Sequence, residues 1–126
     1  MSLQSPLGKF LGHGSAKQGT EHWWGQKLSA VALVPLTLWF AIAMLGLDVT
    51  DLEAVRTWIA GPLNAILLLL LLVAGLYHSM LGVEVIVEDY VHGALKVISL
   101  IILKLAHWAL AVAGIYSVVV ISVGAS

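Results

Sequence analysis

One stretch of the chain includes His78, Asp89 and Tyr90, side chains of types that could take part in redox or proton chemistry. His78 lies in a long apolar run that begins near Ile66, and an ionisable group at membrane depth is costly, which indicates a function. A neutral imidazole there can coordinate a metal or form a hydrogen bond to a neighbouring helix. The residues alone leave both interpretations open.

Two glycines share a helical face with His78, because Gly75 lies three residues before it and Gly82 four residues after it. Glycines at these positions remove side chains where a flat macrocycle such as a heme needs room. The same pattern allows two membrane helices to pack closely, since small residues let the backbones approach. We therefore expect either a heme or a neighbouring helix against this face.

Asp89 and Tyr90 follow His78 by eleven and twelve residues, which is roughly 16 Å along the axis if the helix continues. A phenol at the edge of a membrane can donate a hydrogen bond to a quinone carbonyl, and a nearby carboxylate can accept or relay protons. The alternative is a turn that ends and anchors the helix, with Tyr90 as an interfacial aromatic side chain.

Lys27 and His22 lie beside Trp23 and Trp24 and form an edge of cationic and aromatic groups. These cations could balance the propionates of a heme or carry protons. Alternatively they anchor the chain at the cytoplasmic surface of a membrane, where tryptophan rings are also favoured. The residue types do not separate these two roles.

Two further ionisable groups, Lys104 and His107, are three residues apart on one face of the last apolar segment. Lys104 could extend its ammonium to the nearer surface, or contact a neighbouring protein chain or an anionic lipid. His107 could be a second iron ligand, but a packing or lipid contact is the expected role. His13 and His92 are expected to be solvated loop residues.

The composition shows what must position these groups. Of the 126 residues, 60% are hydrophobic and 10% are charged, and the mean hydropathy is +1.00. A soluble domain is about 25% charged, so the chain belongs to the membrane class. The absence of cysteine excludes a disulfide framework, a thiolate metal site and an iron–sulfur cluster held by this chain. The net charge of −1 gives no indication of a nucleic-acid partner.

Three apolar segments are long enough to cross a bilayer, at about residues 26–47, 61–87 and 94–123. The first contains 20 consecutive residues without Asp, Glu, Lys or Arg, and a helix of that length spans about 30 Å, the thickness of the hydrocarbon core. Pro35 within it could kink the helix. Pro62 suits the start of the second span, since proline is favoured at the first helical position.

The remaining segments are polar. Residues 1–25 lack an apolar period and are expected to form an irregular cytoplasmic arm, without the h-region and cleavage site of a signal peptide. Four charged residues between positions 48 and 56 predict a short connection, with an interfacial turn around Trp58. The predicted fold class is all-α integral membrane. It forms a single membrane domain of three transmembrane helices, whose apolar faces a lipid or protein partner must cover.

Lysine and arginine near the spans predict the orientation. Arg56 lies on one side, and the other side holds Lys9, Lys17, Lys27 and Lys96. The amino terminus and the loop after Tyr90 should therefore face the cytoplasm, with the carboxyl terminus outside. His78 then lies about 24 Å along the second helix from its outer end, past the midplane on the cytoplasmic side.

Two motifs in combination resemble a known family. They are His78 with Gly82 and Asp89-Tyr90 after it, and the amino-terminal stretch GSAKQGTEHWWGQKLSAVALVPL. Together they resemble the family of small hydrophobic membrane anchors of succinate dehydrogenase, respiratory complex II, in its α-proteobacterial form. The resemblance covers nearly the whole chain, and the two motifs are specific when they occur together.

The resemblance implies roles for particular positions. His78 falls where the family supplies one axial ligand of a b-type heme, the other histidine coming from a partner anchor subunit. Tyr90 falls where the family hydrogen-bonds ubiquinone, with Asp89 beside it as proton and orientation partner. Lys27 occupies a position near the heme propionates and quinone where relatives often have arginine, and lysine keeps the charge but not the planar fork.

The resemblance also implies an assembly in the bacterial cytoplasmic membrane. Succinate is oxidised in a flavoprotein subunit, and electrons pass through an iron–sulfur subunit to a quinone at the anchor. The chain would then be a non-autonomous subunit of succinate:ubiquinone oxidoreductase. Two alternatives remain: a small transport or channel component with a proton relay through His78, Lys104 and His107, and a purely structural anchor without heme.

Overall fold

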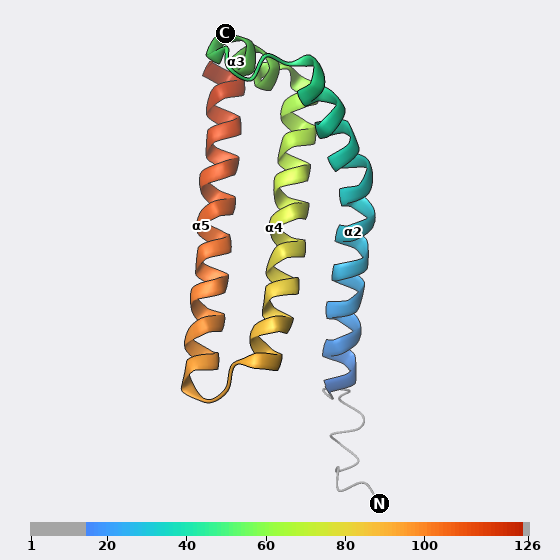
Figure 1. Cartoon of the computed structure of the whole chain (residues 1–126), viewed down its shortest axis with the longest axis vertical. Helices are drawn as coiled ribbons and strands as arrows, with labels where there is room; N and C mark the ends of the chain where they lie inside the picture. The colour runs from blue at the N-terminus through green and yellow to red at the C-terminus, as the bar shows by residue number, and fades with distance from the viewer. Residues whose placement is uncertain (1–14, 125–126) are drawn as a thin grey trace, which may run out of the picture.

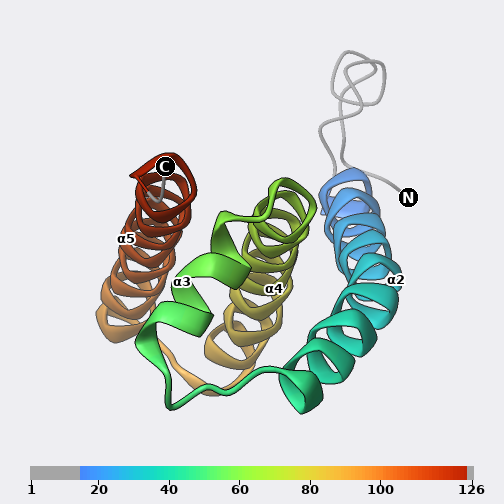
Figure 2. The same cartoon turned by 90° about the horizontal axis from the view of Figure 1, so that it is seen from above.

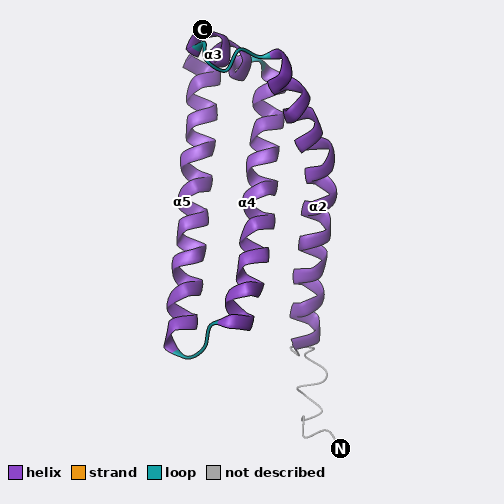
Figure 3. Ribbon diagram, in the orientation of Figure 1, coloured by secondary structure: helices purple, strands orange, loops and turns teal. Residues whose placement is uncertain are grey.

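The computed structural model describes residues 15–124, with side chains from residue 20 onward. Helices make up almost all of this part, which contains no strand (Figure 1, Figure 3). They are α2 (Ser15–Gly46), α3 (Leu52–Ala60), α4 (Pro62–Tyr90) and α5 (Ala94–Gly124). Three are long and apolar enough to cross a membrane, over Thr20–Gly46, Pro62–Tyr90 and Ala94–Gly124. The all-α class and the three predicted spans are confirmed.

The long helices form an open row rather than a closed bundle. The helix α4 lies between α2 and α5 and packs against both, and α3 lies across the ends of α4 and α5 (Figure 2). Between α2 and α5 no contact occurs within the described residues. Among the side chains described, only Ser29, Ala65 and Leu81 are buried. A row of this kind leaves both broad faces apolar and open, so lipid or another protein chain must cover them.

The start of α2 differs from the prediction. An irregular arm over residues 1–25 is wrong for residues 15–25, because α2 begins at Ser15 and carries Trp23 and Trp24 as helical residues. Alanine, lysine, glutamine and glutamate in this segment are good helix formers and outweigh its two glycines. The helix continues through Pro35 and is bowed (Figure 1). Lys9 and His13 lie outside the described residues.

The connection near position 58 is a helix of nine residues rather than a turn. Asp51 caps α3, since its carboxylate accepts a hydrogen bond from the Glu53 backbone N–H at 2.9 Å. Trp58 stacks on Trp39 of α2, with ring centroids 5.6 Å apart. Its carbonyl accepts a hydrogen bond from Asn64 Nδ2 of α4 at 2.9 Å. These contacts hold α2, α3 and α4 together at this end of the row.

At the opposite end, α4 continues to Tyr90, three residues beyond its predicted end. Asp89 and Tyr90 therefore stand on the last helical turn, not in a turn that follows the helix. The chain then reverses through Gly93, whose φ of +68° is the left-handed conformation that glycine adopts most readily. The Lys96 N–H donates to the Gly93 carbonyl at 3.2 Å as α5 begins.

Candidate functional site

His78 on α4 is held by a serine of α2. Its Nδ1 lies 3.0 Å from Ser29 Oγ, and Ser29 Oγ also donates a hydrogen bond to the Gln26 carbonyl at 3.0 Å. His78 Nε2 has no hydrogen-bond partner within residues 20–124. Within residues 20–124, Gln26 Oε1 is the only side-chain oxygen or nitrogen that is both buried and without a hydrogen-bond partner. Since His78 Nε2 lacks a partner but is not such a buried atom, it reaches the surface of the row. The imidazole is thus fixed at one nitrogen and open at the other.

The glycine face of α4 packs against α2. A Cβ added at Gly75 would lie 3.9 Å from Leu33 Cδ2, and one added at Gly82 would lie 3.8 Å from Gln26 Nε2. In the single chain this face serves close helix packing, the second of the two alternatives. A heme against Gly75 and Gly82 stays a prediction.

The site also contains Tyr77, which the sequence did not single out. Its hydroxyl and ring lie directly against Gly25 of α2, where a Cβ would come within 3.2 Å of a ring carbon. A glycine opposite a tyrosine on the next span was the available signal, but it could be recognised only with the register of the two helices in hand.

Asp89 and Tyr90 are exposed at the end of α4, with 79% of the tyrosine accessible. Neither has a side-chain hydrogen bond or ion pair within the described part of the chain. The helix is unbroken between His78 and this end, so the two groups remain roughly 16 Å from His78 along the axis. A carboxylate near a helix C-terminus is disfavoured by the macrodipole, so helix stability does not explain Asp89.

Lys27 and His22 were expected to support a cofactor, and the structure brings one of these two basic side chains, His22, to α4. His22 Nε2 lies 3.9 Å from Glu84 Oε2. Lys27 Nζ lies 5.2 Å from the centroid of the Trp23 ring, a cation–π contact on its own helix. Support of propionates or of a quinone by Lys27 and His22 stays a prediction.

Glu84 is a second residue that the sequence analysis did not select. Its Oε1 lies 3.2 Å from Lys104 Nζ of α5, and its side chain is 15% exposed. Lys104 therefore pairs with an acid of its own chain, an arrangement absent from the roles considered for it. The sequence signal for this ion pair was an acidic residue in one span and a basic residue in the next, both toward the loop that joins the two spans. Together with His22, Glu84 connects all three long helices.

His107 differs from His78 in that both of its nitrogens are engaged. Its Nδ1 lies 2.9 Å from the Leu103 carbonyl, to which it can only donate. Its Nε2 lies 3.2 Å from Ser79 Oγ. An imidazole with both nitrogens in hydrogen bonds has none left for iron, so the packing role fits His107.

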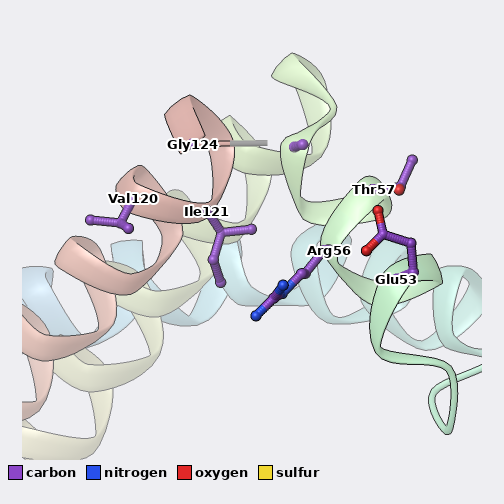
Figure 4. A pocket seen from close by; sticks show the side chains of 7 residues that line it. Glu53, Arg56, Thr57, Val120, Ile121 and Gly124 are labelled. Carbon is purple, nitrogen blue, oxygen red and sulfur yellow. The ribbon is translucent and has the colours of Figure 1, made fainter. Parts of the chain in front are cut away.

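Two of the hollows on the row include a charged residue or a histidine. One, of about 480 Å³, lies between α3 and the end of α5 and is lined by Arg56 and Glu53 among others (Figure 4). The other, of about 340 Å³, is an apolar groove between α4 and α5 that includes Tyr77 and His107. Neither is lined by His78 or Tyr90. A group bound at either residue would therefore lie outside both hollows.

Comparison with known proteins agrees with this architecture. Residues 1–123 match the family described as succinate dehydrogenase/fumarate reductase transmembrane subunit. The chain is 30% identical to the succinate dehydrogenase hydrophobic membrane anchor subunit of Paracoccus denitrificans over 114 residues, 90% of this chain and 88% of that protein.

Rickettsial proteins with the same name are also similar. The one from Rickettsia bellii is 38% identical over 78 residues, a match that spans 62% of each chain and so less than two thirds of that relative. The one from Rickettsia conorii is 34% identical over 90 residues, 71% of each chain. The match over residues 1–123 covers all three long helices, and the chain belongs to the succinate dehydrogenase/fumarate reductase transmembrane subunit family.

Proposed function

We propose that this chain is a membrane-anchor subunit of a succinate:quinone oxidoreductase. In this proposal His78 supplies one axial ligand to a b-type heme shared with the partner anchor subunit. Asp89 and Tyr90 form part of the site where ubiquinone is reduced. The names of the relatives support the anchor role, and the heme and quinone roles rest on the geometry of α4.

The observation that carries the heme proposal is the state of the two His78 nitrogens. Histidines that bind metals do so through one nitrogen, and the other N–H is oriented by a hydrogen bond to a neighbour. His78 Nδ1 has such a neighbour in Ser29, and Nε2 is open. The donor set of this chain thus fits one axial position of a heme. Because His107 is engaged at both nitrogens, the second ligand is expected from the partner anchor subunit.

A heme bound there would supply one-electron transfer. The residues of this chain fix the imidazole at Nδ1 through Ser29 and leave Nε2 at the surface of the row. Burial and axial ligation are the properties through which a protein tunes such a group.

Reduction of a quinone to a quinol takes two electrons and two protons. In the proposal the Tyr90 hydroxyl, at the end of α4, donates a hydrogen bond to a quinone carbonyl oxygen, and the Asp89 carboxylate accepts and passes on protons. Both side chains are exposed, so protons can reach them from the aqueous side. The electrons would come from succinate through the flavoprotein and iron–sulfur subunits, docked at this end.

The open row of helices supports the assembly part of the proposal. Both of its broad faces are apolar, and α2 and α5 do not close on each other within the described residues. The partner anchor subunit, together with the lipid of a bacterial cytoplasmic membrane, would cover these faces. The distribution of lysines supports a cytoplasmic amino terminus and a periplasmic carboxyl terminus.

The transport alternative has less support. A proton relay through His78, Lys104 and His107 needs these groups to face one another. Instead Lys104 pairs with Glu84, and His107 bonds to Ser79 and Leu103. His78 faces the other neighbouring helix, α2.

The heme content of two alanine variants of the complete complex tests the proposal. We expect His78→Ala to lose most of its heme in a pyridine hemochrome assay, because no other described side chain offers an open imidazole at that position. His107→Ala is the matched control and should keep the heme of the unmodified complex. A His78→Ala complex with undiminished heme would make His78 a packing residue.

A further inference from the structure

We propose that Ser29 is the positioning residue for His78: it accepts a hydrogen bond from Nδ1–H and thereby makes Nε2 the metal-binding nitrogen. The inference rests on the proposed function and adds to it a residue of α2. It also explains why a serine is buried between two membrane helices.

The direction of the hydrogen bond follows from counting protons. Ser29 has one hydroxyl proton and two neighbours at 3.0 Å, the Gln26 carbonyl and His78 Nδ1. The carbonyl can only accept. If the hydroxyl proton pointed to Nδ1, the serine and carbonyl oxygens would face each other without a proton between them. Both contacts are satisfied only when the hydroxyl donates to Gln26 and Nδ1–H donates to the hydroxyl.

The tautomer decides which nitrogen can bind a metal. A neutral imidazole carries one proton, so a proton on Nδ1 leaves the lone pair on Nε2. Nε2 is the nitrogen that reaches the surface of the row and lacks a protein partner among the described residues. Because the Ser29 hydroxyl donates its proton to the Gln26 carbonyl of its own helix, an oxygen lone pair of Ser29 faces His78 on α4.

The packing around Ser29 shows that this contact is built into the helix pair. Three successive contacts connect the antiparallel helices α2 and α4: Gln26 with Gly82, Ser29 with His78, and Leu33 with Gly75. Ser29 is 6% exposed and is the one polar residue that is buried in the part of the chain with described side chains. The small residues on either side let the backbones approach, so that a side chain as short as serine reaches the ring.

The second serine–histidine pair has the opposite arrangement and supplies a control. His107 Nδ1–H donates to the Leu103 carbonyl on its own helix, and Ser79 contacts Nε2. There the serine occupies the nitrogen that a metal would use. Removing the Ser79 hydroxyl is therefore expected to leave the heme unchanged, although the chemical change is the same as at Ser29.

The test compares Ser29→Ala, Ser29→Thr and Ser79→Ala in the complete complex, by redox titration of the heme and by its low-temperature EPR spectrum. An acceptor on Nδ1–H makes the imidazole more basic and favours ferric iron. We expect Ser29→Ala to raise the midpoint potential, shift the low-spin EPR signal and weaken heme retention on the order of tenfold. Ser29→Thr keeps the hydroxyl and should restore all three values, and Ser79→Ala should match the unmodified complex.

The outcomes separate this inference from the proposed function. An unmodified complex without heme would contradict the proposed function itself. A heme that is identical in potential and EPR in Ser29→Ala would overturn the role of Ser29 and leave the ligand assignment of His78 intact. Should Ser29→Ala fail to assemble, Ser29→Cys decides by the same measurements. Its thiol is a weaker acceptor of similar shape, so an intermediate shift supports the inference and no shift rejects it.

Discussion

At the scale of single residues, His78 and His107 are alike in the sequence, because each is an imidazole in an apolar helix. The position of His78 along its helix could be predicted, since it depends only on where the helix begins and on its rise per residue. Which nitrogens of each ring form hydrogen bonds could not be predicted, because this depends on the side chains that lie opposite on the neighbouring helices. Ser29, Tyr77 and Glu84 were missed for the same reason.

Tyr90 belongs to the same scale, because one hydroxyl carries its proposed role. Tyr90→Phe removes the hydrogen bond to a quinone carbonyl and little else, since the side chain is 79% exposed. The loss of one such bond predicts a fall of up to about tenfold in kcat/KM for ubiquinone. Succinate oxidation with an artificial acceptor should stay at the level of the unmodified complex.

Tyr116→Phe is the control for this change. Tyr116 is an exposed tyrosine of α5, well away from the turn at Gly93 along that helix, and its hydroxyl should not matter in either assay. A Tyr90→Phe complex with equal activity toward the quinone and the artificial acceptor would remove Tyr90 from the quinone site.

At the scale of elements, the spans could be predicted because charge-free apolar length is a local property of the sequence. The third span begins at the expected residue, 94, and the second at Pro62, within one residue. The predicted start of the first helix was wrong, because the polar helix-forming residues before Trp23 show no apolar periodicity. The order of packing, with α4 in the middle, depends on contacts between helices and was not predicted.

The ion pair between Glu84 and Lys104 joins α4 to α5 and can be measured by a double-mutant cycle. We expect Glu84→Gln and Lys104→Met each to lower the thermal stability of the complex, and the double variant to lose less than the sum. Residues joined in one ion pair show interaction energies of about 0.5–3 kcal/mol, and a coupling in that range is expected.

Lys96→Met provides the comparison cycle with Glu84→Gln. Lys96 has no ion pair in the described part of the chain, so these two changes should be additive. Equal coupling in both cycles would mean that Glu84 responds to the total charge near this end and not to its contact with Lys104.

At the scale of the whole molecule, an open row of three helices cannot enclose a cofactor or bury its own apolar surface. The need for a covering partner could be predicted from composition alone. The face that carries the open His78 nitrogen could not, since it depends on the position of α2. In the proposed assembly the site of this chain is therefore half of one, and a second chain completes it.

The orientation of the molecule can be tested directly because the chain contains no cysteine. Single cysteines at His92→Cys in the loop between α4 and α5, and at Val49→Cys near α3, should report opposite sides of the membrane. A membrane-impermeant maleimide is expected to label the first from the cytoplasmic side and the second from the outside. The reverse pattern would place Tyr90 at the periplasmic surface and contradict quinone reduction beside the flavoprotein and iron–sulfur subunits.

The most direct test of the central claim is the heme content of the unmodified complex. A pyridine hemochrome assay on the purified assembly, with the anchor chain quantified in the same sample, counts b-type heme per copy of this chain. If His78 and a histidine of the partner anchor subunit share one iron, the ratio is one heme per chain, with a Soret band that sharpens on reduction. A fully assembled, active complex without b-type heme would contradict the assignment of His78.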